Sequence, residues 1–240
     1  MRDYSVSIII PCRNEAGTIE EAVKRIPKFG VFQELIFVEG HSTDNTVEEI
    51  LRVQREYPDT HIRFFIQNGE GKGDAVRKGF SRALGSILMI LDADLTVPPE
   101  DLPMFYGILK YGGVNKFVNG CRFTFPQATE AMKSLNWIAN KFFSMVFSYI
   151  LGQRITDTLC GTKALYKSAY KKIQANRDYF GDFDPFGDFD LLFGASRLGM
   201  DIIEIPIHYQ DRKYGTTNIS RFKHGWLLLK MVIFAWRKFK

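Results

Sequence analysis

Cysteine and histidine are scarce in this chain of 240 residues, which contains three cysteines and four histidines. The cysteines, Cys12, Cys121 and Cys160, do not have the spacing of a zinc site, and no two histidines form an H-x-x-x-H or similar pair. Zinc chemistry is therefore not expected. Free thiols in a reducing cytoplasm explain the cysteines better than disulfides do.

Long apolar runs are also missing. No stretch reaches about 18 consecutive apolar residues, so the sequence predicts no conventional membrane span. The first apolar run, Val6–Ile10, is too short and too early for a signal peptide, and no cleavage site follows it. Apolar residues make up 45% of the chain and charged residues 25%, which is typical of a soluble globular protein.

Acidic residues are absent from the last segment, Arg212 to Lys240, although the net charge of the chain is only +5. The segment holds eight basic residues: Arg212, Lys213, Arg221, Lys223, Lys230, Arg237, Lys238 and Lys240. A segment of this kind favours an anionic partner, which the charge alone leaves open among nucleic acid, a phosphorylated substrate and a lipid surface.

Strand and helix signals alternate through the first hundred residues. Apolar β-branched runs predict strands at 6–10, 35–38, 62–66 and 87–91, and helical patterns cover 18–27, 45–56 and 74–83, with a glycine-rich loop at 68–73. Asp44 is expected to cap the second helix. The alternation predicts an α/β fold with a doubly wound, mostly parallel sheet, in which ligands bind at the carboxyl ends of the strands.

The second half is less regular. It predicts strands at 117–119 and 202–207 and helices at 129–151 and 225–236. We expect one domain over residues 1–220, followed by a basic amphipathic C-terminal helix over 221–240.

Two carboxylates, Asp92 and Asp94, follow the predicted strand at 87–91. Because side chains alternate along a strand, residues two apart are expected to point the same way and to repel one another unless a cation lies between them. Mg²⁺ or Mn²⁺ with substrate phosphates would satisfy such a pair. From this triplet alone, a solvated acidic turn is equally compatible with the sequence.

Further motifs follow the other strands in a fixed order. They are Ile10-Pro-Cys-Arg-Asn14-Glu15, Val38-Glu-Gly-His-Ser42-Thr-Asp44, Gly71-Lys72-Gly73-Asp-Ala75, Leu91-Asp-Ala-Asp94-Leu, Gly120-Cys-Arg122, Thr156-Asp157-Thr-Leu-Cys-Gly161-Thr-Lys163, Glu204-Ile-Pro206 and Arg212-Lys-Tyr-Gly215-Thr-Thr217-Asn218. Together they resemble family 2 glycosyltransferases with a GT-A fold, in the polyprenyl-phosphate, dolichol-phosphate mannose synthase-like branch. The resemblance covers about residues 5–220 and raises the metal interpretation of Asp92 and Asp94 well above the acidic turn.

The resemblance implies a donor site for a nucleoside-diphosphate sugar, a GDP- or UDP-sugar. The residues that it assigns to this donor are Pro11, Asn14, Glu15, Glu39, Ser42, Lys72, Asp92 and Ala93, with Asp92 and Asp94 holding Mg²⁺ or Mn²⁺. Related proteins usually carry two acids after the second strand. Here Glu39 and Gly40 occupy those positions, which leaves the choice of base open.

The resemblance also implies transfer with inversion to a polyprenyl (dolichyl-type) phosphate. Arg122 and Arg212 would neutralise phosphates, Asp157 would lie near the acceptor, and Asp188 or Asp190 would orient the acceptor or act as a base. These two acids are equally compatible with a helix cap. The alternative functions are transfer to a glycan or other hydroxyl, and a non-catalytic nucleotide-sugar-binding protein.

Members of this branch often have transmembrane helices after the catalytic domain, and none is predicted here. The segment Trp226–Trp236, about 16 Å long as a helix, is too short to cross a bilayer of roughly 30 Å. Its tryptophans and basic flanks fit an interfacial helix on an anionic leaflet. Packing on the core or on a partner subunit is an equal alternative. We expect a cytoplasmic protein, peripheral at the cytoplasmic membrane face, with a membrane partner subunit or a homo-oligomer as further options and no nucleic-acid partner.

Overall fold

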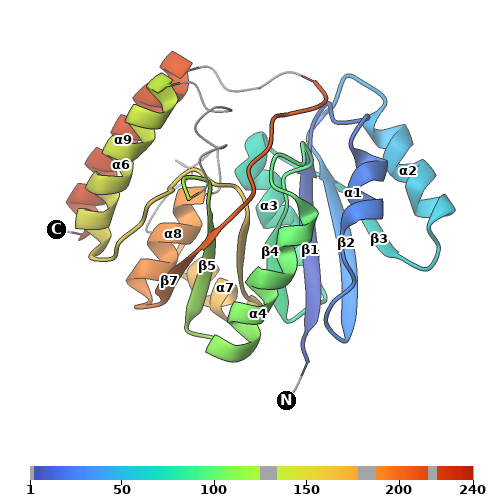
Figure 1. The fold of residues 1–240 in the computed structure, drawn as a ribbon, viewed down its shortest axis with the longest axis horizontal. Coiled ribbons are helices and arrows are strands. Elements are labelled where there is room, and N and C mark those ends of the chain that lie inside the picture. The colour runs from blue at the N-terminus through green and yellow to red at the C-terminus, as the bar shows by residue number, and fades with distance from the viewer. Residues whose placement is uncertain (1–2, 125–133, 178–187, 216–220, 240) are drawn as a thin grey trace.

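The computed structural model describes residues 3–124, 134–177, 188–215 and 221–239, and its centre is a seven-stranded sheet in the order β3-β2-β1-β4-β6-β5-β7 (Figure 1). The strands are β1 (Ser5–Cys12), β2 (Phe32–Glu39), β3 (His61–Ile66), β4 (Ile87–Ile90), β5 (Lys116–Cys121), β6 (Lys163–Tyr166) and β7 (Asp201–Pro206). The helices are α1 (Ile19–Arg25), α2 (Thr46–Glu56), α3 (Gly71–Arg82), η1 (Pro99–Asp101), α4 (Leu102–Gly112), α6 (Ser134–Leu151), α7 (Lys167–Ala175), α8 (Asp188–Arg197) and α9 (Arg221–Phe239).

The first half of the sheet is parallel. β1 pairs with β2 and β4, and β2 pairs with β3, all in the same direction. β6 runs antiparallel to both β4 and β5, whereas β5 and β7 are parallel. The predicted mostly parallel α/β sheet is confirmed, and the single reversed strand brings the segment before β6 to the carboxyl ends of β1 and β4.

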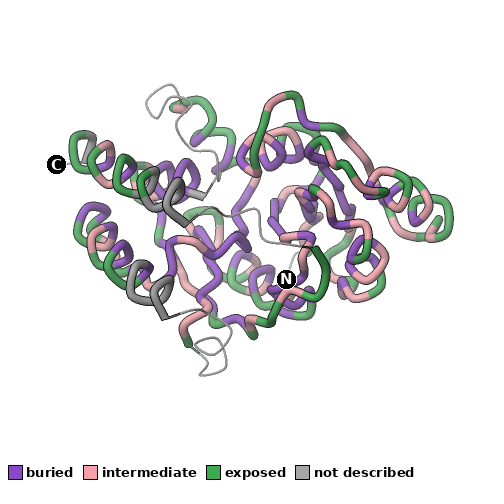
Figure 2. Tube along the Cα trace, turned by 90° about the horizontal axis from the view of Figure 1, so that it is seen from above, coloured by how far each residue is buried: buried purple, intermediate pink, exposed green. Residues whose placement is uncertain are grey.

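The core lies along the central strands and the helix faces that cover them (Figure 2). Ile8, Ile9 and Ile10 of β1 have no exposed surface, as a strand covered on both faces requires. Helix α3 approaches this strand closely at Gly79, where a Cβ atom would lie 2.6 Å from Ile9. The close approach fixes the position of α3, whose first turn belongs to the site described below.

Some predicted boundaries were wrong. Helix α3 begins at Gly71, so the glycines expected in a loop form its first turn. β4 ends at Ile90, and the following residues form a turn in which the Leu95 amide donates to the Asp92 carbonyl at 3.2 Å. The alternation expected of a strand therefore does not apply to Asp92 and Asp94. The elements η1, α4, β6 and α7 were not predicted; for β6 the reason is that a buried run of four residues has no distinctive period.

Helices α6 and α9 lie side by side at the edge of the molecule (Figure 1). The rings of Tyr149 and Trp236 stack with their centroids 5.8 Å apart, while Met231 and Ala235 of α9 are buried. α9 has 19 residues and extends on both sides of the apolar segment 226–236 into the basic flanks, close to the expected bounds 221–240. In the described part of the chain, no helix combines the length and apolar character needed to cross a membrane.

The segment after β7 crosses from one half of the sheet to the other and ends near the carboxyl end of β1 (Figure 1). It is fixed by hydrogen bonds along its length. The His208 amide donates to Asp101 at 3.0 Å, and the Gln210 amide donates to the Thr96 carbonyl at 2.8 Å. This crossing segment, residues 207–215, carries Arg212 to the other strand ends.

Candidate active site

The loops after β1 and β2 are tied to each other by side chains. The backbone amide of Asn14 donates to the Ser42 hydroxyl at 2.9 Å, and the backbone amide of Thr43 donates to the side-chain oxygen Oδ1 of Asn14 at 2.7 Å. The Glu39 carboxylate, which is buried, accepts a hydrogen bond from the Ser42 amide. Asn14 adopts a φ of 57°, a left-handed conformation that asparagine tolerates better than most residues. These contacts give a fixed edge at the ends of the two strands.

Asp92 is paired with the first turn of α3. Lys72 Nζ lies 2.6 Å from Asp92 Oδ1, and both side chains are about one quarter exposed, at 25% and 27%. Gly161, from the segment before β6, faces this pair closely. A Cβ atom there would lie 2.0 Å from Asp92 Oδ2 and 2.1 Å from Lys72 Nζ. Glycine at position 161 therefore leaves room for the ion pair.

Asp94 is paired with the crossing segment. Arg212 donates from Nη2 to Asp94 Oδ2 at 3.0 Å and from Nη1 to Glu15 Oε1 at 2.8 Å, so one guanidinium joins two carboxylates. The other Asp94 oxygen accepts from the amide and the hydroxyl of Thr96, at 3.1 and 3.0 Å. Tyr214, two residues after Arg212, lies against Gly17, where a Cβ atom would be 2.3 Å from the tyrosine ring.

Glu15 has an unusual environment. Burial raises its pKa to about 7, although the neighbouring Arg212 acts in the opposite direction and the charges of Asp94 and Asp92 add to the rise. Its second oxygen, Oε2, is buried without a hydrogen-bond partner among the described residues. Such an atom at a cluster of acids marks a place where a further polar group can be accommodated.

Arg122 and Asp157 form a buried, two-pronged ion pair. Arg122 Nε lies 2.6 Å from Asp157 Oδ2, and Nη2 lies 2.8 Å from Oδ1. Asp157 has no exposed surface. Burial acts to raise its pKa, but the charge and hydrogen bonds of Arg122 prevail and hold the pKa below its ordinary value of 3.8. Both groups are therefore charged at neutral pH.

Tyr209 links the arginine to the carboxylates and was not predicted. The Arg122 guanidinium lies over its ring, 5.4 Å from the centroid. The next residue, Gln210, donates its backbone amide to the Thr96 carbonyl at 2.8 Å, and the amide and hydroxyl of Thr96 donate to Asp94. These contacts connect Arg122 with Asp94 along the crossing segment. Only the neighbouring Arg212 motif could have drawn attention to this tyrosine from the sequence.

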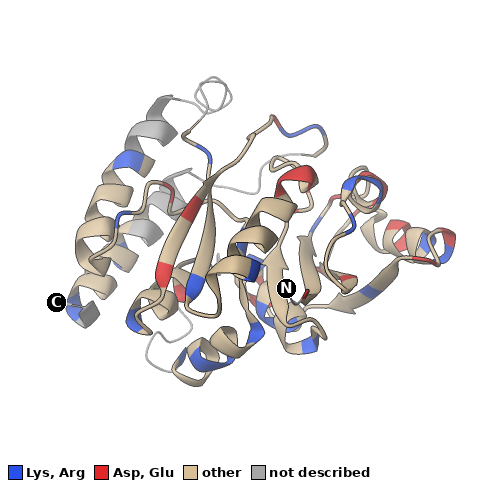
Figure 3. Cartoon of the chain, turned by 60° about the horizontal axis from the view of Figure 1, so that its bottom comes forward, with Lys and Arg blue, Asp and Glu red and all other residues tan. Residues whose placement is uncertain are grey.

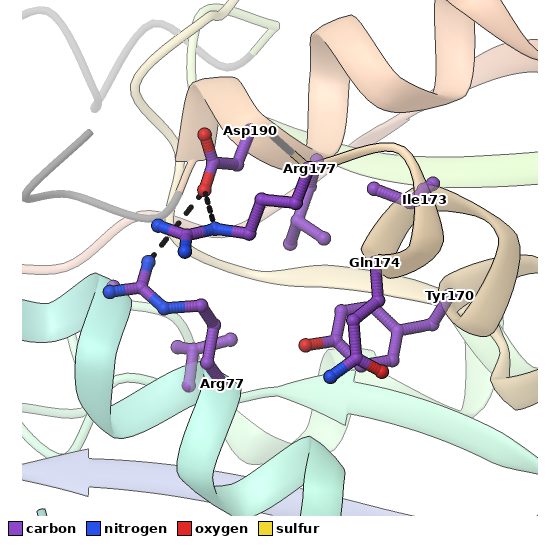
Figure 4. A pocket seen from close by; sticks show the side chains of 9 residues that line it. Arg77, Tyr170, Ile173, Gln174, Arg177 and Asp190 are labelled. Atoms are coloured by element: carbon purple, nitrogen blue, oxygen red, sulfur yellow. Dashed lines mark hydrogen bonds and ion pairs between the residues drawn. The ribbon is translucent and has the colours of Figure 1, made fainter. Parts of the chain in front are cut away.

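Asp190 lies in a pocket between α3, α7 and α8, where it is held by two arginines (Figure 4). Arg177 Nε lies 3.1 Å and Arg77 Nη1 lies 3.6 Å from the same oxygen, Asp190 Oδ2. Tyr170 and Gln174 line the pocket beside this cluster. Asp188 is the first residue of α8, but its side chain lies outside the described part of the structure.

The model of the family described as "Glycosyl transferase family 2" matches residues 7–174. The chain belongs to glycosyl transferase family 2. It is 28% identical over 221 residues to a dolichol-phosphate mannosyltransferase of Pyrococcus furiosus, an alignment that covers 90% of this chain and 59% of that protein. It is 26% identical over 224 residues to an undecaprenyl-phosphate 4-deoxy-4-formamido-L-arabinose transferase of Pectobacterium atrosepticum, covering 91% of this chain and 64% of that protein.

This family 2 chain therefore spans about three-fifths of the length of the curated relatives it matches. Among solved structures, it resembles glucosyl-3-phosphoglycerate synthase from Mycobacterium tuberculosis in complex with Mn²⁺, UDP and glucosyl-3-phosphoglycerate. The TM-score is 0.70 at 19% identity, over 98% of this chain and 80% of that chain. The complex of the same synthase with UDP gives a TM-score of 0.71 at 19% identity, with the same coverage. The predicted GT-A fold and the glycosyltransferase family are confirmed.

The residues of the family 2 site fit a hard divalent cation. Asp92 and Asp94 supply two partly exposed carboxylates at one strand end. Within the described ranges, no group of three or more His, Cys, Asp or Glu residues is placed to hold a metal ion by protein ligands alone. Mg²⁺ is commonly held by one or two carboxylates and substrate phosphates, which matches this donor set.

Most of the predicted site residues meet at the carboxyl ends of the strands. Pro11, Asn14, Glu15, Glu39, Ser42, Lys72, Asp92, Ala93, Asp94, Arg122, Asp157 and Arg212 belong to the strand ends, to the first turn of α3 and to the crossing segment just described. Asp190 lies apart from the ion pairs of Asp92 and Asp94, in its own arginine cluster. Three further contributors, Gly161, Tyr209 and Arg77, were not singled out as functional residues.

Proposed function

We propose that this family 2 chain transfers a sugar from a nucleoside-diphosphate sugar to a polyprenyl phosphate. The observation that carries the proposal is the run of contacts that connects the Asp94 carboxylate with the buried Arg122 through Thr96 and the crossing segment at Tyr209 and Gln210. The first group suits a metal-bound diphosphate, and the second suits an anionic acceptor. The names of the two curated relatives support a polyprenyl-phosphate acceptor.

On the donor side, Asp92 and Asp94 would hold Mg²⁺ or Mn²⁺, which when bound neutralises the charge that develops on the leaving diphosphate. Lys72, which is paired with Asp92 at the first turn of α3, would contact the diphosphate. Glu39 and Ser42 would fix the edge that contacts the nucleotide, together with Pro11, Asn14 and Ala93. UDP- and GDP-sugars are alternative donors, because the Glu39 carboxylate accepts a hydrogen bond from the Ser42 amide and so does not indicate which base is bound.

On the acceptor side, Arg122 and Arg212 would orient the phosphate for in-line attack on the anomeric carbon, with inversion. A phosphate monoester has a second pKa of about 6, so its attacking oxygen is already ionised near neutral pH and needs no strong base. A hydroxyl acceptor needs a carboxylate base instead. The described candidates for that base, Asp157 and Asp190, are each held by arginine, which favours the phosphate acceptor.

The transfer assay uses radiolabelled UDP- and GDP-sugars, a polyprenyl phosphate and either Mn²⁺ or Mg²⁺. We expect labelled product that partitions into organic solvent and is lost on chelation. Asp94→Ala should abolish transfer without unfolding the protein, while Asp59→Ala, in an exposed turn before β3, serves as a control. Transfer only to soluble hydroxyl acceptors would refute the lipid acceptor, and unchanged turnover of Asp94→Ala would refute the metal assignment.

We further propose that the pair of helices α6 and α9 docks on the anionic cytoplasmic face of a membrane. Neither helix contains an acidic residue, and Figure 3 marks basic but no acidic positions along their described parts. Large apolar side chains are exposed on both helices: Phe142, Met145, Tyr149, Trp226, Leu229, Ile233 and Trp236. The contact of Tyr149 with Trp236 joins the two exposed rows. Apolar area with basic residues is what an anionic interface attracts.

Co-sedimentation with vesicles tests this docking. We expect binding to vesicles that contain phosphatidylglycerol, weaker binding to pure phosphatidylcholine, and loss of binding in Trp226→Ala/Trp236→Ala. Val31→Ala, which removes an exposed apolar side chain remote from both helices, is the control and should bind normally. Equal binding to both kinds of vesicle together with normal binding of the double tryptophan variant would refute membrane docking. A stable dimer that buries both tryptophans would refute it as well.

A further inference from the structure

Asp157 makes more contacts than its ion pair with Arg122. Its Oδ1 also accepts from the Leu159 amide at 3.0 Å and from Asn140 Nδ2 at 3.3 Å, and its Oδ2 accepts from the Arg122 amide at 3.1 Å. With no exposed surface and both oxygens occupied, Asp157 cannot touch an acceptor directly. Any effect of this carboxylate on the reaction must therefore pass through Arg122.

The turn that carries Asp157 is itself held by β7. Glu204 accepts from the Thr156 amide at 2.8 Å and from the Asp157 amide at 2.9 Å, with one oxygen for each. On the other side, Asn119 Nδ2 donates to the Asp157 carbonyl at 2.7 Å. The backbone of this turn is thus fixed by two strands of the sheet, which leaves the side-chain contact of Asn140 as the contribution from outside the sheet.

Asn140 belongs to α6, and it is buried while other residues of the same helix are exposed. Phe142, Met145 and Tyr149 face outward, on the surface that we propose for docking. One rigid helix therefore carries both a docking face and a hydrogen bond to the partner of Arg122. An arginine that is fixed in advance binds phosphate better than one that must be ordered on binding.

We propose that Asn140 is a positioning residue that orients the Arg122 guanidinium through Asp157, so that acceptor binding depends on helix α6. This inference rests on the proposed function, in which Arg122 binds the acceptor phosphate. The chain of contacts is Asn140 Nδ2 to Asp157 Oδ1 and Asp157 to Arg122, and it requires the amide of Asn140 to donate.

Three variants separate positioning from packing. Asn140→Ala removes the donor, and Asn140→Asp keeps the shape but places a second carboxylate beside Asp157. Ser144→Ala is the matched control, because Ser144 is also buried on α6 and its hydroxyl donates only to the Lys141 carbonyl, at 2.9 Å, among the described residues. If Asn140 served only to fill space, Asn140→Ala would lower the free energy of unfolding but leave the acceptor KM unchanged. Positioning predicts a raised acceptor KM in Asn140→Ala.

Steady-state kinetics use a short-chain polyprenyl phosphate as the acceptor. We expect Asn140→Ala to raise the acceptor KM by about three- to tenfold, as the loss of one hydrogen bond implies, with the donor KM unchanged. Asn140→Asp should raise the acceptor KM further, and Ser144→Ala should match the wild type. Equal rises of donor and acceptor KM, or an unchanged acceptor KM in Asn140→Ala, would overturn the proposal.

A second measurement does not depend on activity. The Nε–H signal of Arg122, assigned by its loss in Arg122→Lys, is followed by NMR with and without inorganic phosphate. We expect Asn140→Ala, but not Ser144→Ala, to shift this signal and to weaken its response to phosphate. If the wild type transfers to no polyprenyl phosphate, the proposed function fails while a shifted signal still supports positioning. An unshifted signal in Asn140→Ala overturns the positioning inference whatever the activity.

Discussion

Substitution of Gly161 by alanine is expected to damage donor binding without unfolding the protein. A Cβ atom at position 161 would lie 2.0 Å from Asp92 Oδ2 and 2.1 Å from Lys72 Nζ, whereas ordinary van der Waals contact begins at 3.4 Å. The two side-chain ends must therefore move by at least about 1.3 Å, or Gly161 must move by a similar amount. Asp92 Oδ2 and Lys72 Nζ are the ends of flexible, partly exposed side chains, so the cost in free energy of unfolding should be small, about 1 kcal/mol or less.

The effect on function should be larger than the effect on stability. A misplacement of about 1 Å at a reacting group can lower the rate by roughly 100-fold, because binding geometry is lost. We expect Gly161→Ala to weaken binding of Mn²⁺ with a nucleoside diphosphate by at least about tenfold, which corresponds to about 1.4 kcal/mol. Titration calorimetry measures this affinity, and urea denaturation measures the free energy of unfolding.

Gly107→Ala is the matched control for this substitution. Gly107 lies within α4, and a Cβ atom there would meet nothing within 4 Å. Alanine at that position should stabilise the helix by up to about 1 kcal/mol and leave the affinity for the nucleotide unchanged. If Gly161→Ala binds Mn²⁺ and the diphosphate as tightly as the wild type, then Asp92 and Lys72 do not form the donor site and the assignment is refuted.

Three further predictions concern pH and packing. The pKa of Glu15 is raised from 4.5 to about 7 in the folded protein, so its contribution to stability is present below about pH 4.5 and is lost as the pH rises through 7. In metal-free buffer, the free energy of unfolding of the wild type relative to Glu15→Gln should therefore fall between pH 4.5 and 7. A constant difference would contradict the burial of Glu15. Asp157 has the opposite sign, since its pKa is lowered: the stability it contributes is present above its ordinary pKa of 3.8 and is lost as the pH falls further, so acid denaturation of Asp157→Asn should lack this component. Gly79→Ala should destabilise the protein by about 1–3 kcal/mol in urea denaturation, because its Cβ would press on Ile9 inside the core, and wild-type stability would show that α3 and β1 can separate at little cost.

The parallel half of the sheet and the positions of the proposed donor residues were predictable because each motif directly follows an apolar strand. Strand ends of a parallel sheet share one edge, so the order of motifs along the chain was enough to place Asn14, Glu39 and Asp92 near one another. The alternation argument for Asp92 and Asp94 was wrong in detail, since β4 ends at Ile90. The two carboxylates still lie in the site, because backbone hydrogen bonds hold the turn that carries them at the carboxyl edge of the sheet.

The surroundings of the proposed acceptor residues were less predictable, because these residues pair over long distances in the sequence. Arg122 and Asp157 are separated by 35 residues and meet through the reversed strand β6, which has only four residues and no period of its own. Sequence patterns do not show with which buried carboxylate an arginine will form an ion pair. Arg212 is a similar case, since its contacts with Glu15 and Asp94 span 197 and 118 residues.

In the proposed function, these long-range pairs separate two tasks. On the proposed donor side, Asp92 and Asp94 are each paired with a partly exposed cationic side chain, so each pair would open at a small cost to bind a divalent cation and a diphosphate. On the acceptor side, Arg122 is paired with a fully buried carboxylate, and removing either partner would leave an uncompensated charge that costs about 3–5 kcal/mol. The donor pairs are therefore suited to exchange partners during each turnover, whereas the Arg122–Asp157 pair is suited to remain fixed throughout it.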